Sequence, residues 1–195
     1  MIIVVGLGNP GDEYKNTRHN AGRIILELLA KKDGFTEWKD QPKIKALVSK
    51  GEIEQEKMTF VMPNNFMNNS GTSVAPMILS KKDLAKLVVV YDDLDIPIGK
   101  IKISFNRSSG GHNGLESIIK RVKSPEFVRI RVGVSPHTPS GKLRKPTGEK
   151  AVLDFLLKNF KDSEMADLKK VAKTVREALV VFSAESKEKA MTLFN

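Results

Sequence analysis

The stretch Ile2-Ile3-Val4-Val5-Gly6-Leu7-Gly8-Asn9-Pro10-Gly11 decides how the fold begins. Four consecutive apolar residues followed by glycine are typical of a short strand that is buried on both faces of a sheet. Apolar side chains then recur at helical spacing from Arg23 to Leu29, which predicts a helix after the loop. The chain therefore opens as strand, loop and helix, as an α/β domain does.

The glycines of this stretch match the pattern G-x-G-x-x-G of dinucleotide-binding sites. Such a site needs a helix that begins at the glycines, because the N–H groups of its first turn bind the pyrophosphate. Here Asp12 and Glu13 follow the last glycine, and helical periodicity resumes only near Ala21. We therefore interpret the glycines as a tight turn that brings polar side chains to the end of the first strand, a common place for a ligand site. A nicotinamide-dependent oxidoreductase is kept as a third, distant alternative.

Strands and helices alternate along the rest of the chain. The runs 2–5 and 87–90 are continuously apolar, whereas 100–105 and 128–134 alternate polar and apolar residues, which favours covered central strands and half-exposed edges. The fold class that we predict is α/β: a single domain over residues 1–195 with a twisted mixed β-sheet flanked by helices. A mobile loop is expected at 135–149, before a helical C-terminal part at 151–195. Further strands are expected at 45–51, 58–62 and 87–91, and helices at 70–79, 114–122, 151–159, 163–182 and near the C-terminus.

The composition excludes several classes of function. The chain has no cysteine, which excludes disulfides, thiolate metal sites and a cysteine nucleophile. No window holds the roughly 18 apolar residues that a membrane span needs, and the first residues lack the basic segment of a secretory signal, so we expect a cytoplasmic protein with no membrane contact. The formal net charge of +10 favours a polyanionic partner such as nucleic acid, although a solvated lysine face explains it equally well.

Two histidines occur in similar surroundings. His19 stands in Arg-His-Asn-Ala-Gly and His112 in Gly-His-Asn-Gly, and the chain has only three histidines. A histidine in front of a helix is often a capping or core residue, but it is also the side chain that moves protons near neutral pH. Both interpretations stay open on the sequence alone.

Two further clusters present oxygen and amide groups. Asp92, Asp93 and Asp95 follow an apolar strand, where they could bind a hard cation, orient a histidine or cap a turn. The segment Phe66-Met67-Asn68-Asn69-Ser70-Gly71 presents carboxamides beside glycine, and an Asn or Ser there could simply begin a helix. Because no further ligands follow at a metal-binding spacing, we predict no metal.

Taken in order, GLGNPG, TRHNAG, FMNNSG, DDLDIP, GGHNG, FVRIRVG and VLDFLLKNF closely resemble the bacterial-type peptidyl-tRNA hydrolase family, from Ile2 to about Phe160. The resemblance implies hydrolysis of the ester between a peptide and the 3′-terminal ribose of tRNA, in ribosome rescue, with no metal or cofactor. It implies peptidyl-tRNA as the partner, bound through its acceptor stem and 3′ end. A tRNA- or RNA-binding relative with little hydrolytic activity is the alternative. We expect a monomer.

The resemblance also implies roles for single residues. His19 matches the catalytic histidine, Asp92 the carboxylate that orients it, and Arg131 one half of a clamp for a tRNA phosphate. The chemistry agrees, because attack on an ester needs a water that loses a proton, and neutral amides can stabilise the oxyanion. Substrate contacts are implied for Asn9, Tyr14, Met67, Asn68, His112 and Asn113. Further candidates for phosphate binding are Arg107, Lys142, Arg144 and Lys145.

Three places depart from the residues usual in that family. Tyr91 stands where a histidine usually precedes the aspartate, and Asn106-Arg107-Ser108 stands where a run of glycines is usual. Ser104 occupies the position of the second clamp residue, a lysine. Arg107 or Lys102 is the candidate to replace that lysine.

Overall fold

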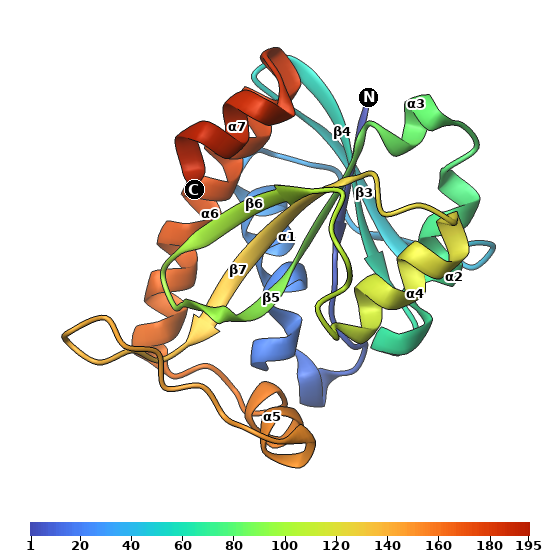
Figure 1. Cartoon of the computed structure of the whole chain (residues 1–195). Coiled ribbons are helices and arrows are strands. Elements are labelled where there is room, and N and C mark those ends of the chain that lie inside the picture. Colours follow the sequence, from blue (N-terminus) through green and yellow to red (C-terminus); the bar gives the residue numbers. More distant parts are fainter.

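Seven strands form one mixed sheet in the computed structural model, which describes residues 1–195 (Figure 1). The strand order is β2-β3-β4-β1-β5-β7-β6. β1 pairs in parallel with β4 and β5, and β5 pairs in parallel with β7, while β2, β3 and β6 are antiparallel to their neighbours. The predicted mixed sheet is confirmed. The strands are β1 Ile2–Gly6, β2 Lys39–Gln41, β3 Ala46–Ile53, β4 Glu56–Pro63, β5 Leu87–Pro97, β6 Ile101–Phe105 and β7 Val128–Ser135.

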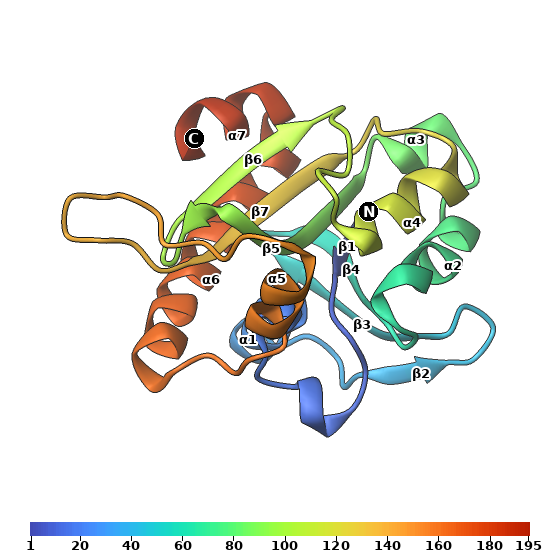
Figure 2. The same cartoon turned by 60° about the horizontal axis from the view of Figure 1, so that its bottom comes forward.

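Helices cover both faces of the sheet (Figures 1 and 2). α1 packs against α6 on one face, and α2 packs against α4 on the other, while α7 lies along the edge strand β6. α5 stands apart from these layers, close to the turn before α1. None of the helices combines the length and apolar character that a membrane crossing requires. The helices are α1 Ala21–Lys32, α2 Ser70–Val74, α3 Lys81–Leu84, α4 Asn113–Val122, α5 Glu149–Leu156, α6 Asp162–Ala184 and α7 Lys187–Phe194.

The central strands are buried on both faces, as their apolar runs predict. In β1, Val4 belongs to the hydrophobic core under α1 and α6, while Val5 belongs to the core under α2 and α4. Val88 and Val89 alternate in the same way in β5. Because successive side chains of a strand point to opposite faces, a strand between two helical layers must be apolar at every position.

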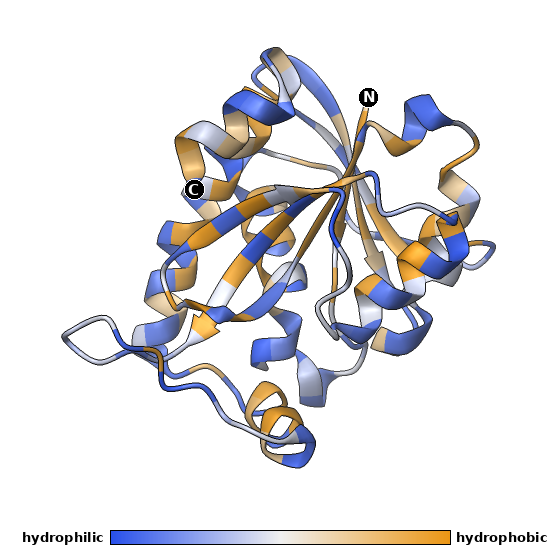
Figure 3. Cartoon of the chain, in the orientation of Figure 1, coloured by the Kyte–Doolittle hydropathy of each residue, from blue (hydrophilic) through white to orange (hydrophobic).

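β7 differs from the half-exposed edge that its alternating sequence predicts. It lies between β5 and β6, and only β6 is at the edge. Figure 3 shows hydrophobic and hydrophilic residues alternating along β7. Of its polar positions, Arg129 is only 1% exposed and Arg131 is half-buried. The alternation therefore marks one buried and one half-buried arginine, and not an edge strand that faces solvent.

Two local predictions also need correction. The helix expected at 70–79 ends at Val74 and continues as a 3₁₀ turn, Ala75–Met77, because Pro76 has no N–H to extend the helix. The strand β2 and the helix α3 are absent from the predictions, since three and four residues are too few to display a period.

The start of the chain folds as a turn and not as a nucleotide-binding loop. Two 3₁₀ turns, Asp12–Tyr14 and Arg18–Asn20, separate the glycines from α1, which begins at Ala21. A Cβ atom on Gly22 would lie 2.2 Å from the carbonyl oxygen of Val90. Only glycine therefore allows the first turn of α1 to approach β5 this closely, and that approach places the preceding turn beside the end of β5.

Candidate active site

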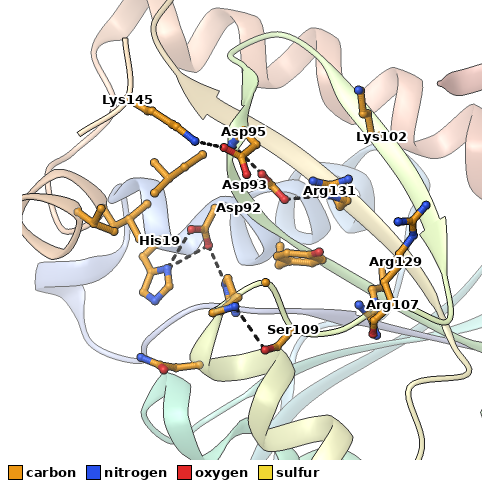
Figure 4. A pocket seen from close by; sticks show the side chains of 18 of the residues that line it. His19, Asp92, Asp93, Asp95, Lys102, Arg107, Ser109, Arg129, Arg131 and Lys145 are labelled. Carbon is orange, nitrogen blue, oxygen red and sulfur yellow. Dashed lines mark hydrogen bonds and ion pairs between the residues drawn. The ribbon is translucent and has the colours of Figure 1, made fainter. Parts of the chain in front are cut away.

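A cleft of about 880 Å³ opens beside the carboxyl end of β5 and runs along β6 and β7. The parallel strands β1, β4, β5 and β7 all end on this side of the sheet, which is where ligands bind in open α/β sheets. In Figure 4, His19 and Asp92 lie at one end of the cleft and Arg129, Arg107 and Lys102 at the other. The cleft thus has an acid–base end and a cationic end.

His19 and Asp92 form a buried pair. The Nδ1 atom of His19 lies 3.0 Å and 3.1 Å from the two carboxylate oxygens of Asp92, and both residues are buried (Figure 4). Burial disfavours a charged ring, but the neighbouring carboxylate outweighs it and raises the pKa of His19 above its usual value. The pair leaves Nε2 of His19 without a hydrogen bond inside the protein, so this nitrogen is the one that can accept a proton.

His112 binds the same carboxylate and lies beside His19, with 5.2 Å between the two ring centroids. Its Nε2 atom lies 3.2 Å from Asp92 Oδ1, while its Nδ1 atom accepts the N–H groups of Gly114 and Leu115 at the start of α4. Because Nδ1 is an acceptor, the proton must be on Nε2, which donates it to Asp92. Burial would raise the pKa of Asp92, but the two histidines hold it well below its usual range. Asp92 therefore stays ionised.

The same hydrogen bonds argue against a metal at this cluster. One ligand atom each from His19, Asp92 and His112 lie within 4.8 Å of one another, the spacing of a metal site. A metal would need a lone pair on Nε2 of His112, and this nitrogen carries the proton as long as its ring caps α4 through Nδ1. The donor set therefore suits two N–H groups that donate to one carboxylate better than a metal ion.

Asn9 is fixed with its amide oriented in one direction. Its Oδ1 atom accepts the N–H of Met67 at 2.8 Å, so its Nδ2 group is the end left free to donate. The side chain of Asn20 binds both the N–H and the carbonyl of Asn9, each at 2.9 Å. Asn20 directly follows His19 in the same 3₁₀ turn. Its two hydrogen bonds therefore tie the backbone of Asn9 to the turn that carries the imidazole of His19.

The other predicted substrate residues are distributed unevenly. Asn113 lines the cleft as the first residue of α4. Met67 is buried and belongs to the core under α2 and α4, whereas Asn68 beside it is exposed. Tyr14 is half-buried in the first 3₁₀ turn and does not line the cleft. Contacts of all four with a substrate stay predictions.

Two of the predicted phosphate-binding cations are already paired with acids. Arg131 Nε lies 2.8 Å from Asp93 Oδ2, and the ammonium of Lys145 contacts Asp95 (Figure 4). Lys102 stands directly opposite Arg131 in the antiparallel β6–β7 ladder, which places both cations on the same wall. Arg107 also lines the cleft, whereas Lys142 and Arg144 are exposed on the loop before α5 and lie outside its lining.

Several contacts of the site are missing from the sequence predictions. Asn20 and Arg129 bind groups that belong to the site or to the loops beside it, and Asp93, predicted only as one of three acids after a strand, binds Arg131. Arg18, which the sequence suggests as a ligand contact, instead anchors the turn of His19 to the segment after α5, through Glu164 at 2.7 Å and the carbonyl of Asn159 at 3.0 Å. Asn20 and Arg18 flank His19, but a single sequence carries no signal for partners that lie far away along the chain.

Neither Ser70 nor Ser109 is equipped as a nucleophile. The hydroxyl of Ser70 is buried and donates to the carbonyl of Met67, and that of Ser109 accepts from the N–H of Gly111. Neither hydroxyl is hydrogen-bonded to a histidine. A buried histidine–carboxylate pair at the end of a cleft, with no serine hydroxyl bound to the histidine, is typical of an enzyme of the hydrolase class.

Comparison with known proteins identifies the family. The family model described as "Peptidyl-tRNA hydrolase" matches residues 3–195. The chain is 43% identical to the peptidyl-tRNA hydrolase of Carboxydothermus hydrogenoformans and 39% identical to that of Brevibacillus brevis, in each case over 100% of this chain and 98% of the relative. The crystal structure of peptidyl-tRNA hydrolase from Acinetobacter baumannii superimposes with a TM-score of 0.86 at 31% identity, covering 100% of this chain and 94% of that one. The chain belongs to the peptidyl-tRNA hydrolase family.

Proposed function

We propose that this chain hydrolyses peptidyl-tRNA at the ester between the peptide and the 3′-terminal ribose, with His19 as the general base. Membership of the family supports the reaction. The observation that carries the role of His19 is its buried contact with Asp92 through Nδ1, which leaves Nε2 free as a proton acceptor. A positioned base of this kind contributes roughly 10²–10⁴-fold to a rate.

The reaction follows from these positions. His19 Nε2 removes a proton from a water as the water oxygen attacks the ester carbonyl, and Asp92 stabilises the imidazolium that forms. The tetrahedral intermediate then expels the ribose oxygen, which takes the proton from His19. The products are free tRNA and a peptide with a carboxylate end. His112, as an N–H donor to Asp92, keeps that carboxylate ionised and fixed in place.

Asn9 is the residue that we assign to the developing oxyanion. Its Oδ1 atom is occupied by Met67, so its Nδ2 group can donate to the carbonyl oxygen without reorganisation. A neutral amide avoids the desolvation cost of burying a charge. Asn113 and the exposed Asn68 are proposed to contact the 3′ end of the tRNA and the peptide.

The cationic end of the cleft is proposed to bind phosphates of the acceptor stem. Arg131 and Lys102 lie on the same wall of the cleft. Lys102 is proposed to replace the clamp lysine that is usual in the family, whose position Ser104 occupies here. Arg107 supplies a third charge, and the exposed Lys142 and Arg144 extend the positive surface. Contacts of this kind are sensitive to salt and independent of sequence, which suits an enzyme that acts on many tRNAs.

We also propose that the enzyme acts as a monomer in the cytoplasm, without membrane contact and without a cofactor. One chain supplies both ends of the cleft, which supports action as a single subunit. Residues 135–149 are proposed to be mobile. The contact of Lys145 with Asp95 ties this segment to the end of β5 and is proposed to open when substrate enters.

The test is release of free tRNA from an N-acylated aminoacyl-tRNA in EDTA, with the unacylated aminoacyl-tRNA beside it. The variants are His19→Ala and, as a matched control, His137→Ala, since His137 is exposed and lies outside the cleft. We expect cleavage of the acylated substrate by the wild type and by the control variant only. Salt-sensitive tRNA binding without cleavage by the wild type would instead support the RNA-binding alternative.

A further inference from the structure

Arg129 carries a buried positive charge that no carboxylate neutralises. It lies on β7, is 1% exposed and takes part in no ion pair. Its guanidinium lies over the ring of Phe127, with 4.8 Å between the central carbon and the ring centroid. Burying a cation without a counter-ion is costly, so the contacts that Arg129 does make must compensate for it.

The two terminal nitrogens of this guanidinium donate to backbone carbonyl groups, while Tyr91 also contacts the guanidinium and Nε is buried without a partner. Nη1 donates to Ser108 O at 2.6 Å, and Nη2 donates to Arg107 O and, at 3.4 Å, to Pro125 O. Two adjacent carbonyls of the loop between β6 and α4 are therefore bound by one planar fork. A guanidinium can do this because its donors have a fixed geometry, whereas the ammonium of lysine is a single point.

The loop held in this way leads directly into the acid–base end of the cleft. It begins at Asn106, which has a positive φ of 51°, and includes Gly110 and Gly111, also with positive φ. It ends at His112, whose ring caps α4 and donates to Asp92. Apart from the fork of Arg129, the loop contains only the turn contacts of Ser109 with Gly111 and His112.

We infer that Arg129 is a positioning residue: by fixing the carbonyls of Arg107 and Ser108, it sets where His112 and Asn113 stand relative to Asp92. This inference rests on the proposed function, because it assigns His112 and Asn113 to the reacting end of the cleft. Arg129 lies at the cationic end of the cleft, but it is only 1% exposed and both of its terminal nitrogens are already bound to backbone carbonyls, so we do not assign it to a tRNA phosphate. Its effect is therefore expected on turnover and not on tRNA binding.

The test compares Arg129→Lys, which keeps the charge and loses the fork, with Arg129→Met, which loses both. Displacements of about 1 Å around reacting groups can cost about 100-fold in rate. We expect kcat to fall about 10- to 100-fold in both variants, while the Kd for uncharged tRNA stays within about twofold. The NMR signal of the His112 Nε2–H, hydrogen-bonded to a buried carboxylate in the wild type, is expected to shift or broaden in both.

Arg176→Lys is the matched control, because Arg176 also holds two partners, Asp33 and Glu54, far from the cleft. It is expected to lower the melting temperature with kcat and the His112 signal unchanged. Ser108→Gly is a second variant. It leaves the core intact but loosens the backbone whose carbonyl accepts from Arg129, and we expect a smaller loss of kcat than in the Arg129 variants. This variant decides the matter if neither Arg129 variant folds.

Three results would overturn the inference. First, if Arg129→Lys folds and keeps the full kcat, the positive charge alone suffices and the forked hydrogen bonds are not needed. Second, if neither Arg129 variant folds and Ser108→Gly keeps the full kcat, the loop need not be held for turnover. Third, a higher Kd for tRNA in the Arg129 variants, with a reduced dependence on salt, would mean that Arg129 binds phosphate directly. A failure of the proposed function looks different, because the wild type itself would then release no tRNA and His19→Ala would change nothing.

Discussion

Asn20 binds the backbone of Asn9 at two points, since its Oδ1 accepts the N–H of Asn9 and its Nδ2 donates to the carbonyl, both at 2.9 Å. Asn9 in turn accepts the N–H of Met67 through its own side chain. The loop after β1, the turn that carries His19 and the segment after β4 are thereby joined at one point. This joint holds the proposed base and the proposed oxyanion donor in a fixed relation.

Asn20→Ala tests this joint. It leaves the N–H and carbonyl of Asn9 unpaired in a buried site, and we expect about 1–3 kcal/mol lower stability. We also expect kcat to fall about 10- to 100-fold, because Asn9 and His19 lose their fixed relation. Asn65→Ala is the control, since the amide of Asn65 also binds two partners but lies outside the cleft. Equal stability loss with full kcat in Asn20→Ala would contradict the interpretation.

Asp92→Asn is expected to abolish most of the activity while the fold is kept. An asparagine amide can donate to His19 Nδ1, which would move the imidazole proton to Nε2 and remove the base. The loss of kcat should be roughly 10³–10⁴-fold, as for other histidines whose orienting carboxylate is replaced. Single-turnover cleavage of N-acylated aminoacyl-tRNA measures it. A loss below about tenfold would mean that His19 works without the carboxylate.

The dependence of activity on pH should show the raised pKa of His19. General-base catalysis needs the neutral ring, so kcat should fall as the pH drops through a pKa above 6.5. Stability should change in the opposite direction. Because the folded state binds the proton more tightly, the stabilising effect of the His19–Asp92 pair is complete below the unfolded pKa and is lost as the pH rises through the folded one.

The pH profile of kcat and denaturant melts between about pH 4.5 and 8.5 measure these two changes, a range of about two units on each side of the ordinary histidine pKa. His19→Ala should flatten the stability profile in this window, with His137→Ala as the control. An acid limb of kcat that lies below pH 6.5 would show that the carboxylate does not dominate over burial.

The predictions from sequence succeed where a property is local. The apolar runs of β1 and β5 follow directly from burial on both faces, and the late onset of helical periodicity places α1 at Ala21. The acidic and basic residues of the acid–base end can also be predicted, because a histidine and an aspartate are recognisable from residue type and their motifs resemble a known family. His19 and Asp92 are 73 positions apart, however, and only the approach of α1 to β5 at Gly22 brings them into contact.

The predictions fail where a side chain has an unexpected partner. The arginines of β7 resemble solvent-facing positions, because alternation does not distinguish solvent from buried carbonyls and carboxylates. Arg129 binds a loop more than twenty residues earlier in the chain, and Arg131 binds Asp93 on the neighbouring strand. Such pairs depend on strand order and register, which one sequence without relatives does not specify.

The ion pair between Arg131 and Asp93 leads to the last prediction. Both side chains are partly buried, and their 2.8 Å contact must open or be shared before Arg131 can bind a phosphate fully. Asp93→Asn keeps an oxygen that can accept the N–H of Asp95 but removes the charge that competes for Arg131. We therefore expect tRNA to bind about 3- to 10-fold more tightly, which corresponds to roughly 1 kcal/mol.

The measurement is the Kd for uncharged tRNA at several salt concentrations. Asp95→Asn is the matched control, because its pair with Lys145 is exposed and should change the Kd less than about twofold. Arg131→Gln should weaken binding and lower the slope of log Kd against log salt by about 1, the share of one phosphate contact. The Asp93→Asn gain should vanish in the double variant with Arg131→Gln, since it acts through that guanidinium. Weaker binding by Asp93→Asn alone would mean that Asp93 orients Arg131 toward the phosphate and does not compete with it.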